Sequence, residues 1–135
     1  MILFPLAART QTGSPYTKAF QCRTGAARFV LNYTAESAGT MTLDCKLQYW
    51  TGTAWADLVT SAEAGIDFVQ FTGVAVQTLT VGPEGPAEEL AVVPTLFALF
   101  PLPRVLRAVA TVAGGAGGDT VTFSLTMEEL GVGGA

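Results

Sequence analysis

The sequence predicts an all-β domain, either an antiparallel β-sandwich or a jelly-roll-like fold. Apolar and polar residues alternate with a period of two in several segments, turns containing Gly or Pro separate those segments, and no segment carries the apolar period of a helix of useful length. About six to eight short strands without intervening helices must cover one another's apolar faces, which favours packed antiparallel sheets. The 135 residues are enough for one such domain.

The alternation is clear in two segments of the first half. In residues 28–34, Phe29, Leu31 and Tyr33 share one face. Residues 41–50 repeat the pattern, and their apolar face holds Leu43, Cys45, Leu47 and Tyr49. This alternation is typical of an antiparallel strand with one side in the core and the other in water.

Turn signals place the next strands. Residues 51–54 predict a tight turn, so residues 55–59 are expected to return along the preceding strand. Two further short β segments are expected at residues 66–72 and 74–81, on either side of Gly73.

The end of the chain carries a strong β signal. Residues 105–112 and 120–127 flank the glycine-rich turn at residues 113–119, and we predict that they form a hairpin. The core-facing side chains of the second strand are Val121, Phe123, Leu125 and Met127.

Two segments fall outside this pattern. Residues 1–20 begin apolar and become polar, and we predict an extended N-terminal arm that precedes a single β-sandwich domain at residues 21–135. Residues 82–103 are predicted to form a long Pro-rich apolar loop, an insertion that serves as an interface. Within it, residues 90–103 contain three prolines and no charge, which excludes a regular helix and a central strand.

The composition favours contact with other chains. Half of the residues are hydrophobic and 13% are charged, against about 25% charged in an average globular protein. We interpret the excess as surface buried in an oligomer or against another protein. The alternatives are a hydrophobic count raised by alanine, and cover of the open sandwich ends within one chain. The expected contact residues are Leu3, Phe4, Phe97, Leu99, Phe100 and Leu102.

Several chemistries are disfavoured. A formal net charge of −4 gives no attractive field for a phosphate backbone, so no direct nucleic-acid partner is expected. The chain has no histidine, which removes the usual general base and the commonest metal ligand. We therefore expect no enzymatic activity, no catalytic residue, no cofactor and no metal. Cys22 and Cys45 are predicted to be free thiols.

No membrane association is expected from the sequence. No apolar run reaches the roughly 18 residues of a spanning helix. The apolar N-terminal stretch lacks a positive region before it and ends by Ala8, unlike a signal peptide.

Trp50 and Trp55 flank one turn and are candidate glycan-contact residues, because aromatic side chains can form a platform for a sugar. The alternative is that the two rings pack against each other across a hairpin.

Four segments occur in an order that resembles a known family. They are residues 29–35 (FVLNYTA), 39–48 (GTMTLDCKLQ), 51–57 (TGTAWAD) and 102–111 (LPRVLRAVAT). The order resembles the small β-sandwich proteins of tailed-bacteriophage virions, over about residues 28–127. The chain departs from them at Thr51-Gly52, where Asp-Gly is usual, and in the insertion at residues 90–103.

The resemblance implies a structural role. It implies an oligomeric capsid decoration (cement) or minor capsid protein, with a homotrimer as the favoured assembly and the major capsid protein as partner. The expected location is the capsid surface of the virion, after synthesis in the host cytoplasm. Two alternatives stay open: a carbohydrate- or receptor-binding module of a tail or head fibre, and another head–tail or tail structural component.

Overall fold

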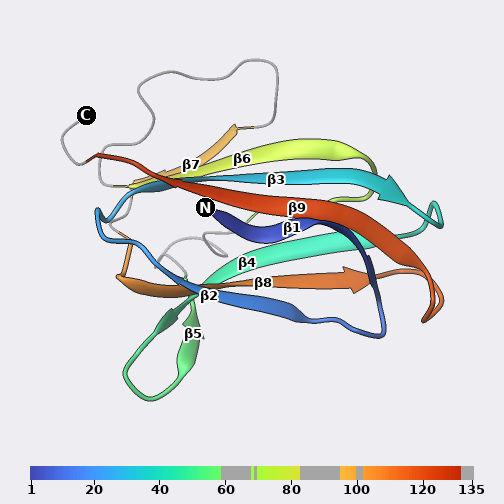
Figure 1. The fold of residues 1–135 in the computed structure, drawn as a ribbon, viewed down its shortest axis with the longest axis horizontal. Coiled ribbons are helices and arrows are strands. Elements are labelled where there is room, and N and C mark those ends of the chain that lie inside the picture. The colour runs from blue at the N-terminus through green and yellow to red at the C-terminus, as the bar shows by residue number, and fades with distance from the viewer. Residues whose placement is uncertain (59–67, 69, 83–94, 100–101, 132–135) are drawn as a thin grey trace.

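The computed structural model describes residues 1–58, 68, 70–82, 95–99 and 102–131, with backbone alone at residues 95–99, and contains two packed β-sheets (Figure 1). In this part of the chain no residue is helical, and the all-β sandwich prediction is confirmed. The strands are β1 (Ile2–Thr10), β2 (Tyr16–Gln21), β3 (Ala27–Glu36), β4 (Thr42–Trp50), β5 (Trp55–Asp57), β6 (Ala75–Gly82), β7 (Thr95–Leu99), β8 (Val105–Ala113) and β9 (Thr120–Glu129).

The two sheets have different widths. One has five strands in the order β1-β9-β3-β6-β7, and the other has four in the order β2-β8-β4-β5. Neighbouring strands are antiparallel except β6 and β7, which are parallel. The edge strands are therefore β1 and β7 in the first sheet, and β2 and β5 in the second.

The predicted period-two faces form the core between the sheets. Phe29, Leu31 and Tyr33 are fully buried, as predicted. The face of β9 that carries Phe123 and the face of β4 that carries Leu43 also point inward. Each buried Leu, Val or Phe side chain contributes about 1.5–3 kcal/mol through the hydrophobic effect. The largest fully buried side chains are Tyr33, Phe29, Phe123, Leu31, Met41, Leu43, Leu47, Leu106, Leu125, Val81, Val112 and Val121.

The prediction that β8 and β9 pair as a hairpin is wrong. β8 lies between β2 and β4, whereas β9 lies between β1 and β3 in the other sheet. The glycine-rich segment at residues 114–118 therefore crosses from one sheet to the other. Packed sheets are about 10 Å apart, a distance that such a connection spans and a two-residue turn does not.

The first 20 residues belong to the sandwich and do not form a separate arm. β1 pairs with β9 and β2 pairs with β8. Pro5 lies in the shift of register between Phe4 and Ala7. An edge strand needs hydrogen bonds on one side alone, so it tolerates a proline and a bulge that a central strand would not.

Part of the predicted interface insertion is also a strand. β7 runs along β6, with Thr95 opposite Thr78 and Leu99 opposite Gly82. Its place at a sheet edge agrees with the prediction that the segment is not a central strand. The backbone N–H of Leu102 then donates to the carbonyl of Gly25 at 2.8 Å, and its side chain enters the core.

Candidate binding surfaces

The structure places the six sequence-predicted contact residues in different surroundings. Leu3, Phe4 and Leu102 are buried in the core of their own chain, with 2%, 6% and 6% of their surfaces exposed. Their side chains are covered by their own chain and have no free surface for a partner. We therefore do not retain these three residues as contact residues. Phe97 and Leu99 lie in β7, where the structure describes the backbone alone, and Phe100 lies outside the described residues.

A different set of N-terminal side chains is exposed. Met1, Ile2 and Leu6 have 63%, 63% and 58% of their surfaces exposed, and together we call them the β1 patch. They lie at an edge of the five-stranded sheet, and the first charged side chain after them is Arg9. All three lie within the first six residues of the chain, and exposed apolar side chains at a sheet edge can serve as a protein contact surface.

Arg9 fixes the irregular part of β1. Its Nη1 donates to the carbonyls of Phe123 at 2.9 Å and Ala7 at 3.2 Å, and its Nη2 donates to that of Pro5 at 2.8 Å. The guanidinium lies 4.5 Å from the ring centroid of Phe123, and burial lowers the pKa of Arg9. Two β1 carbonyls are thereby occupied within the chain, which opposes addition of a foreign strand and leaves side chains as the means of contact.

The second surface surrounds the turn between β4 and β5. Trp50 pairs with Trp55 across the hairpin, with ring centroids 5.3 Å apart and ring planes at 63°. Cross-strand packing of the two rings is thus confirmed. Because the rings are inclined, they do not make one flat platform. Trp50 is 42% exposed and Val105 is 36% exposed.

Arg107 joins this surface from β8. The register sets Gln48 opposite both Arg107 and Asp57, so the three side chains share a row on the outer face of the four-stranded sheet. The guanidinium carbon of Arg107 lies 4.8 Å from the ring centroid of Trp55. We call Trp50, Trp55, Val105 and Arg107 together the hairpin patch.

A line of polar contacts holds Arg107 in place. Arg107 Nε donates to Gln48 Oε1 at 2.6 Å, and Gln48 Nε2 donates to Asp57 Oδ1 at 2.8 Å. Lys46 Nζ contacts the same Asp57 oxygen at 3.0 Å. Sequence reasoning did not identify Arg107, because the residues around it depend on the register of three strands. The alternation in residues 41–50 did indicate that Lys46 and Gln48 point outward, to the face on which Arg107 lies.

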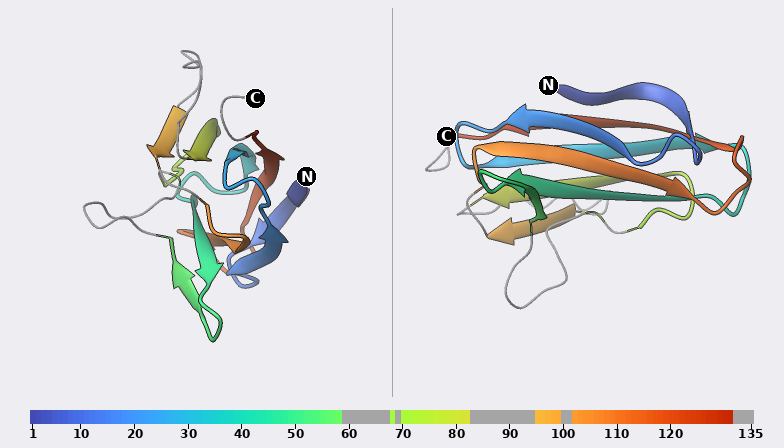
Figure 2. Two further views of the ribbon diagram at one scale, coloured as in Figure 1. Left: turned by 90° about the vertical axis from the view of Figure 1, so that its left-hand side faces the viewer. Right: turned by 90° about the horizontal axis from the view of Figure 1, so that it is seen from below.

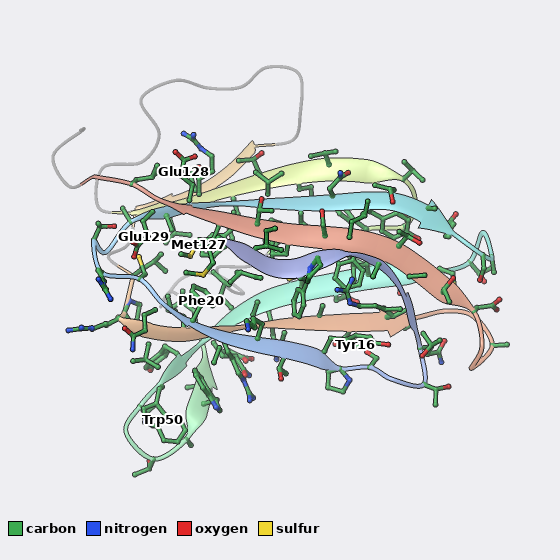
Figure 3. The ribbon with its side chains drawn as sticks, in the orientation of Figure 1. Tyr16, Phe20, Trp50, Met127, Glu128 and Glu129 are labelled. Atoms are coloured by element: carbon green, nitrogen blue, oxygen red, sulfur yellow. The ribbon has the colours of Figure 1, made fainter. Side chains whose placement is uncertain are left out.

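The β1 patch and the β4–β5 hairpin, which carries Trp50 and Trp55, lie on opposite sides of the molecule. At one open edge of the sandwich, β1 of the five-stranded sheet lies beside β2 of the four-stranded sheet. β5 is at the far end of the four-stranded sheet from β2. Figure 2 shows β1 and β5 on opposite sides. The β4–β5 hairpin projects beyond the body of the sandwich, and Figure 3 shows Trp50 on it.

The Asp57 carboxylate provides a test of this polar line. The hydrogen bond from Gln48, and then the contact with Lys46, lower the pKa of Asp57. The ionised Asp57 carboxylate therefore adds a small amount to the free energy of unfolding. This contribution is fully present above the unfolded pKa of about 3.9 and is lost as the pH falls through the lower pKa of the folded state. We expect an NMR titration of the Asp57 carboxyl carbon to give a midpoint below 3.9, and Gln48→Leu to raise it. A midpoint at or above the ordinary value would contradict the geometry.

Other chemistry is sparse in the described part of the chain. No group of three or more Cys, Asp and Glu side chains is placed there to hold a metal. Cys22 and Cys45 are buried and neither forms a disulfide, as predicted. Among the same residues, no helix combines the length and apolar character needed to cross a membrane.

Comparison with known proteins gives no relative: no family model, no curated protein and no solved structure matches the chain. The two patches are therefore the basis for a proposal of function.

Proposed function

We propose that the protein is a non-catalytic structural component of a tailed-bacteriophage virion, which binds the capsid surface as an oligomeric decoration protein. The observation that carries the proposal is the β1 patch, in which Met1, Ile2 and Leu6 are each more than half exposed on an edge strand. Burial of one Leu or Ile side chain against a partner contributes about 1.5–3 kcal/mol before the cost of association. A homotrimer is the favoured assembly.

The positions of the two patches support a bridging role. A decoration protein stabilises a shell when one molecule holds two neighbours together. In this protein the β1 patch lies at one edge of the sandwich, and the hairpin patch extends from β5 at the opposite edge across the outer face to β8, so each can contact a different chain. We propose that the β1 patch contacts another copy and that the hairpin patch contacts the major capsid protein.

The choice of a virion protein rests on the sequence resemblance. The segments that carry it fall on β3, β4, the β4–β5 hairpin and β8, which are neighbours in the two sheets or face each other across the core. Other head–tail or tail components share that resemblance. The location at the capsid surface is therefore part of the proposal.

A second candidate function is binding of a carbohydrate or receptor by a fibre module. The exposure of Trp50 favours it, since an accessible indole can stack on a sugar ring. The angle of 63° between the rings of Trp50 and Trp55 opposes a flat two-ring platform. Glycan-array binding that disappears in Trp50→Ala would support this candidate, and an array without any bound glycan would dismiss it.

Size-exclusion chromatography with light scattering tests the oligomer. We expect the wild-type protein to elute as an oligomer of the 14.0 kDa chain, and Leu6→Asp to elute as a monomer because a charge would be buried at the contact. Val74→Asp is the matched control, since Val74 is 67% exposed and lies outside both patches. A monodisperse wild-type monomer at high concentration would count against the proposal.

A further inference from the structure

We propose that the hairpin patch binds a carboxylate side chain, Asp or Glu, presented by a protein partner beside an apolar residue. Arg107 receives the carboxylate, and Trp50 and Val105 receive the apolar neighbour. The inference rests on the proposed function in one respect, namely that the partner is a protein. It concerns a surface separate from the β1 patch.

The hydrogen-bond inventory of Arg107 is incomplete. A guanidinium has five N–H donors, and here the Nε donor is used by Gln48. Among the described residues, no acceptor lies within hydrogen-bond distance of Nη1 or Nη2, and the remaining contact is the ring of Trp55. The two terminal nitrogens form a planar fork that matches the two oxygens of a carboxylate.

The fork is also held in one orientation. Gln48 donates to Asp57 through Nε2, and this turns its Oε1 toward Arg107. The Trp55 ring supports the guanidinium from the side. A side chain that is already ordered loses less conformational entropy when a ligand binds. Arg107 should therefore bind a carboxylate more tightly than an unconstrained surface arginine would.

The charge of Arg107 is not balanced by the described residues around it. Asp57 contacts Lys46 at 3.0 Å, and Asp44 accepts a hydrogen bond from Gln70 Nε2 at 2.8 Å. In this described part of the sheet, neither carboxylate forms an ion pair with Arg107. A positive group without a local counterion, flanked by exposed apolar surface, is complementary to an anion with an apolar neighbour.

The shape and residue types favour a protein over a sugar or a nucleic acid. Trp50 and Trp55 lie on a projecting hairpin and Val105 and Arg107 on the outer face of β8, whereas small ligands are usually bound in concave pockets (Figure 1). Trp and Arg are the residue types most enriched among binding hot spots. The net charge of −4 opposes a polyphosphate partner.

An NMR titration of the purified chain with two dipeptides tests the inference. The probe is N-acetyl-leucyl-glutamate amide, and the control probe is the isosteric N-acetyl-leucyl-glutamine amide. We expect the glutamate peptide to shift the Arg107 Nε–H and the Trp50 indole N–H resonances, more weakly at high salt. The glutamine peptide is expected to leave them unchanged. Equal shifts from both peptides, or no shift up to the solubility limit, would overturn the inference.

Matched variants locate the response. Arg107→Gln is expected to weaken binding by at least about tenfold, because charge-assisted hydrogen bonds are lost. Arg104→Gln makes the same change of net charge at an exposed neighbouring residue and is expected to bind as wild type. Arg107→Lys keeps the charge but not the fork, so binding several-fold weaker than wild type is expected in a folded protein. Wild-type affinity in Arg107→Lys and Arg107→Gln would contradict the assigned role.

The same titration separates this inference from its rivals. If N-acetylneuraminic acid binds more tightly than the glutamate peptide and depends on Arg107, the ligand is an acidic sugar and the protein assignment is wrong. The titration needs neither a capsid nor an oligomer. If the protein is a monomer in light scattering and the glutamate peptide still binds, the oligomer proposed for the β1 patch is wrong and this inference stands.

Discussion

Replacing Arg9 with alanine is expected to lower the free energy of unfolding by about 3 kcal/mol. The substitution removes charge-assisted hydrogen bonds to the carbonyls of Pro5, Ala7 and Phe123, and also the contact with the Phe123 ring. Hydrogen bonds to charged groups contribute about 1.5–3 kcal/mol each when well formed, and partial exposure of these reduces their sum. For a domain of this size, the melting temperature should fall by roughly 10 °C.

Two further variants give this expectation its control. Arg9→Lys retains the charge, but an ammonium group cannot reproduce the planar arrangement of donors, so less than half of the loss should be recovered. Arg23→Ala removes an exposed arginine and should change stability by no more than about 0.5 kcal/mol. Equal melting temperatures for Arg9→Ala and Arg23→Ala would show that Arg9 does not hold β1.

Gly114→Ala is expected to destabilise the protein by a similar amount, about 3 kcal/mol. Gly114 has φ of 92°, in a region that costs a residue with a Cβ about 1–2 kcal/mol. An added Cβ would also lie 2.1 Å from the Thr40 carbonyl oxygen, so the backbone must move. That movement would disturb the bond from Thr40 Oγ1 to the Gly114 carbonyl, which is 2.7 Å long.

Gly118→Ala is the matched control in the same connection. Gly118 has no positive φ, and an added Cβ would meet no atom within 4 Å. Its substitution should leave stability within about 0.5 kcal/mol of wild type in urea-induced unfolding. If the two alanine variants unfold at the same urea concentration, the tight approach of Gly114 to Thr40 is absent in solution.

The central strands and the edge strand β5 could be predicted from sequence, whereas the edge strands β1, β2 and β7 could not. β3 and β9 alternate regularly because each has a neighbour on both sides along most of its length, and β4 pairs with β8 along nearly its whole length. This pairing fixes the phase of their side chains. In β1 the consecutive residues Leu3 and Phe4 are both buried, because the register shifts on either side of Phe4. That bulge breaks the period of two on which the prediction depended.

The candidate surfaces were predictable to different extents. The pairing of Trp50 and Trp55 follows from a short turn between them, which is local information. The place of Arg107 depends on the alignment of β8 with β4, two strands far apart in the chain. Hydrophobicity alone also did not distinguish buried Leu3 from exposed Leu6, since both are leucines in the same strand and differ in which face of it they occupy.

The most direct measurement is a density map of the intact phage particle at side-chain resolution. The proposal predicts the chain on the outer capsid surface, with Leu6 against a second copy and Arg107 against an Asp or Glu side chain of the major capsid protein. A map in which both patches face solvent, or a purified particle that lacks the chain, would contradict it.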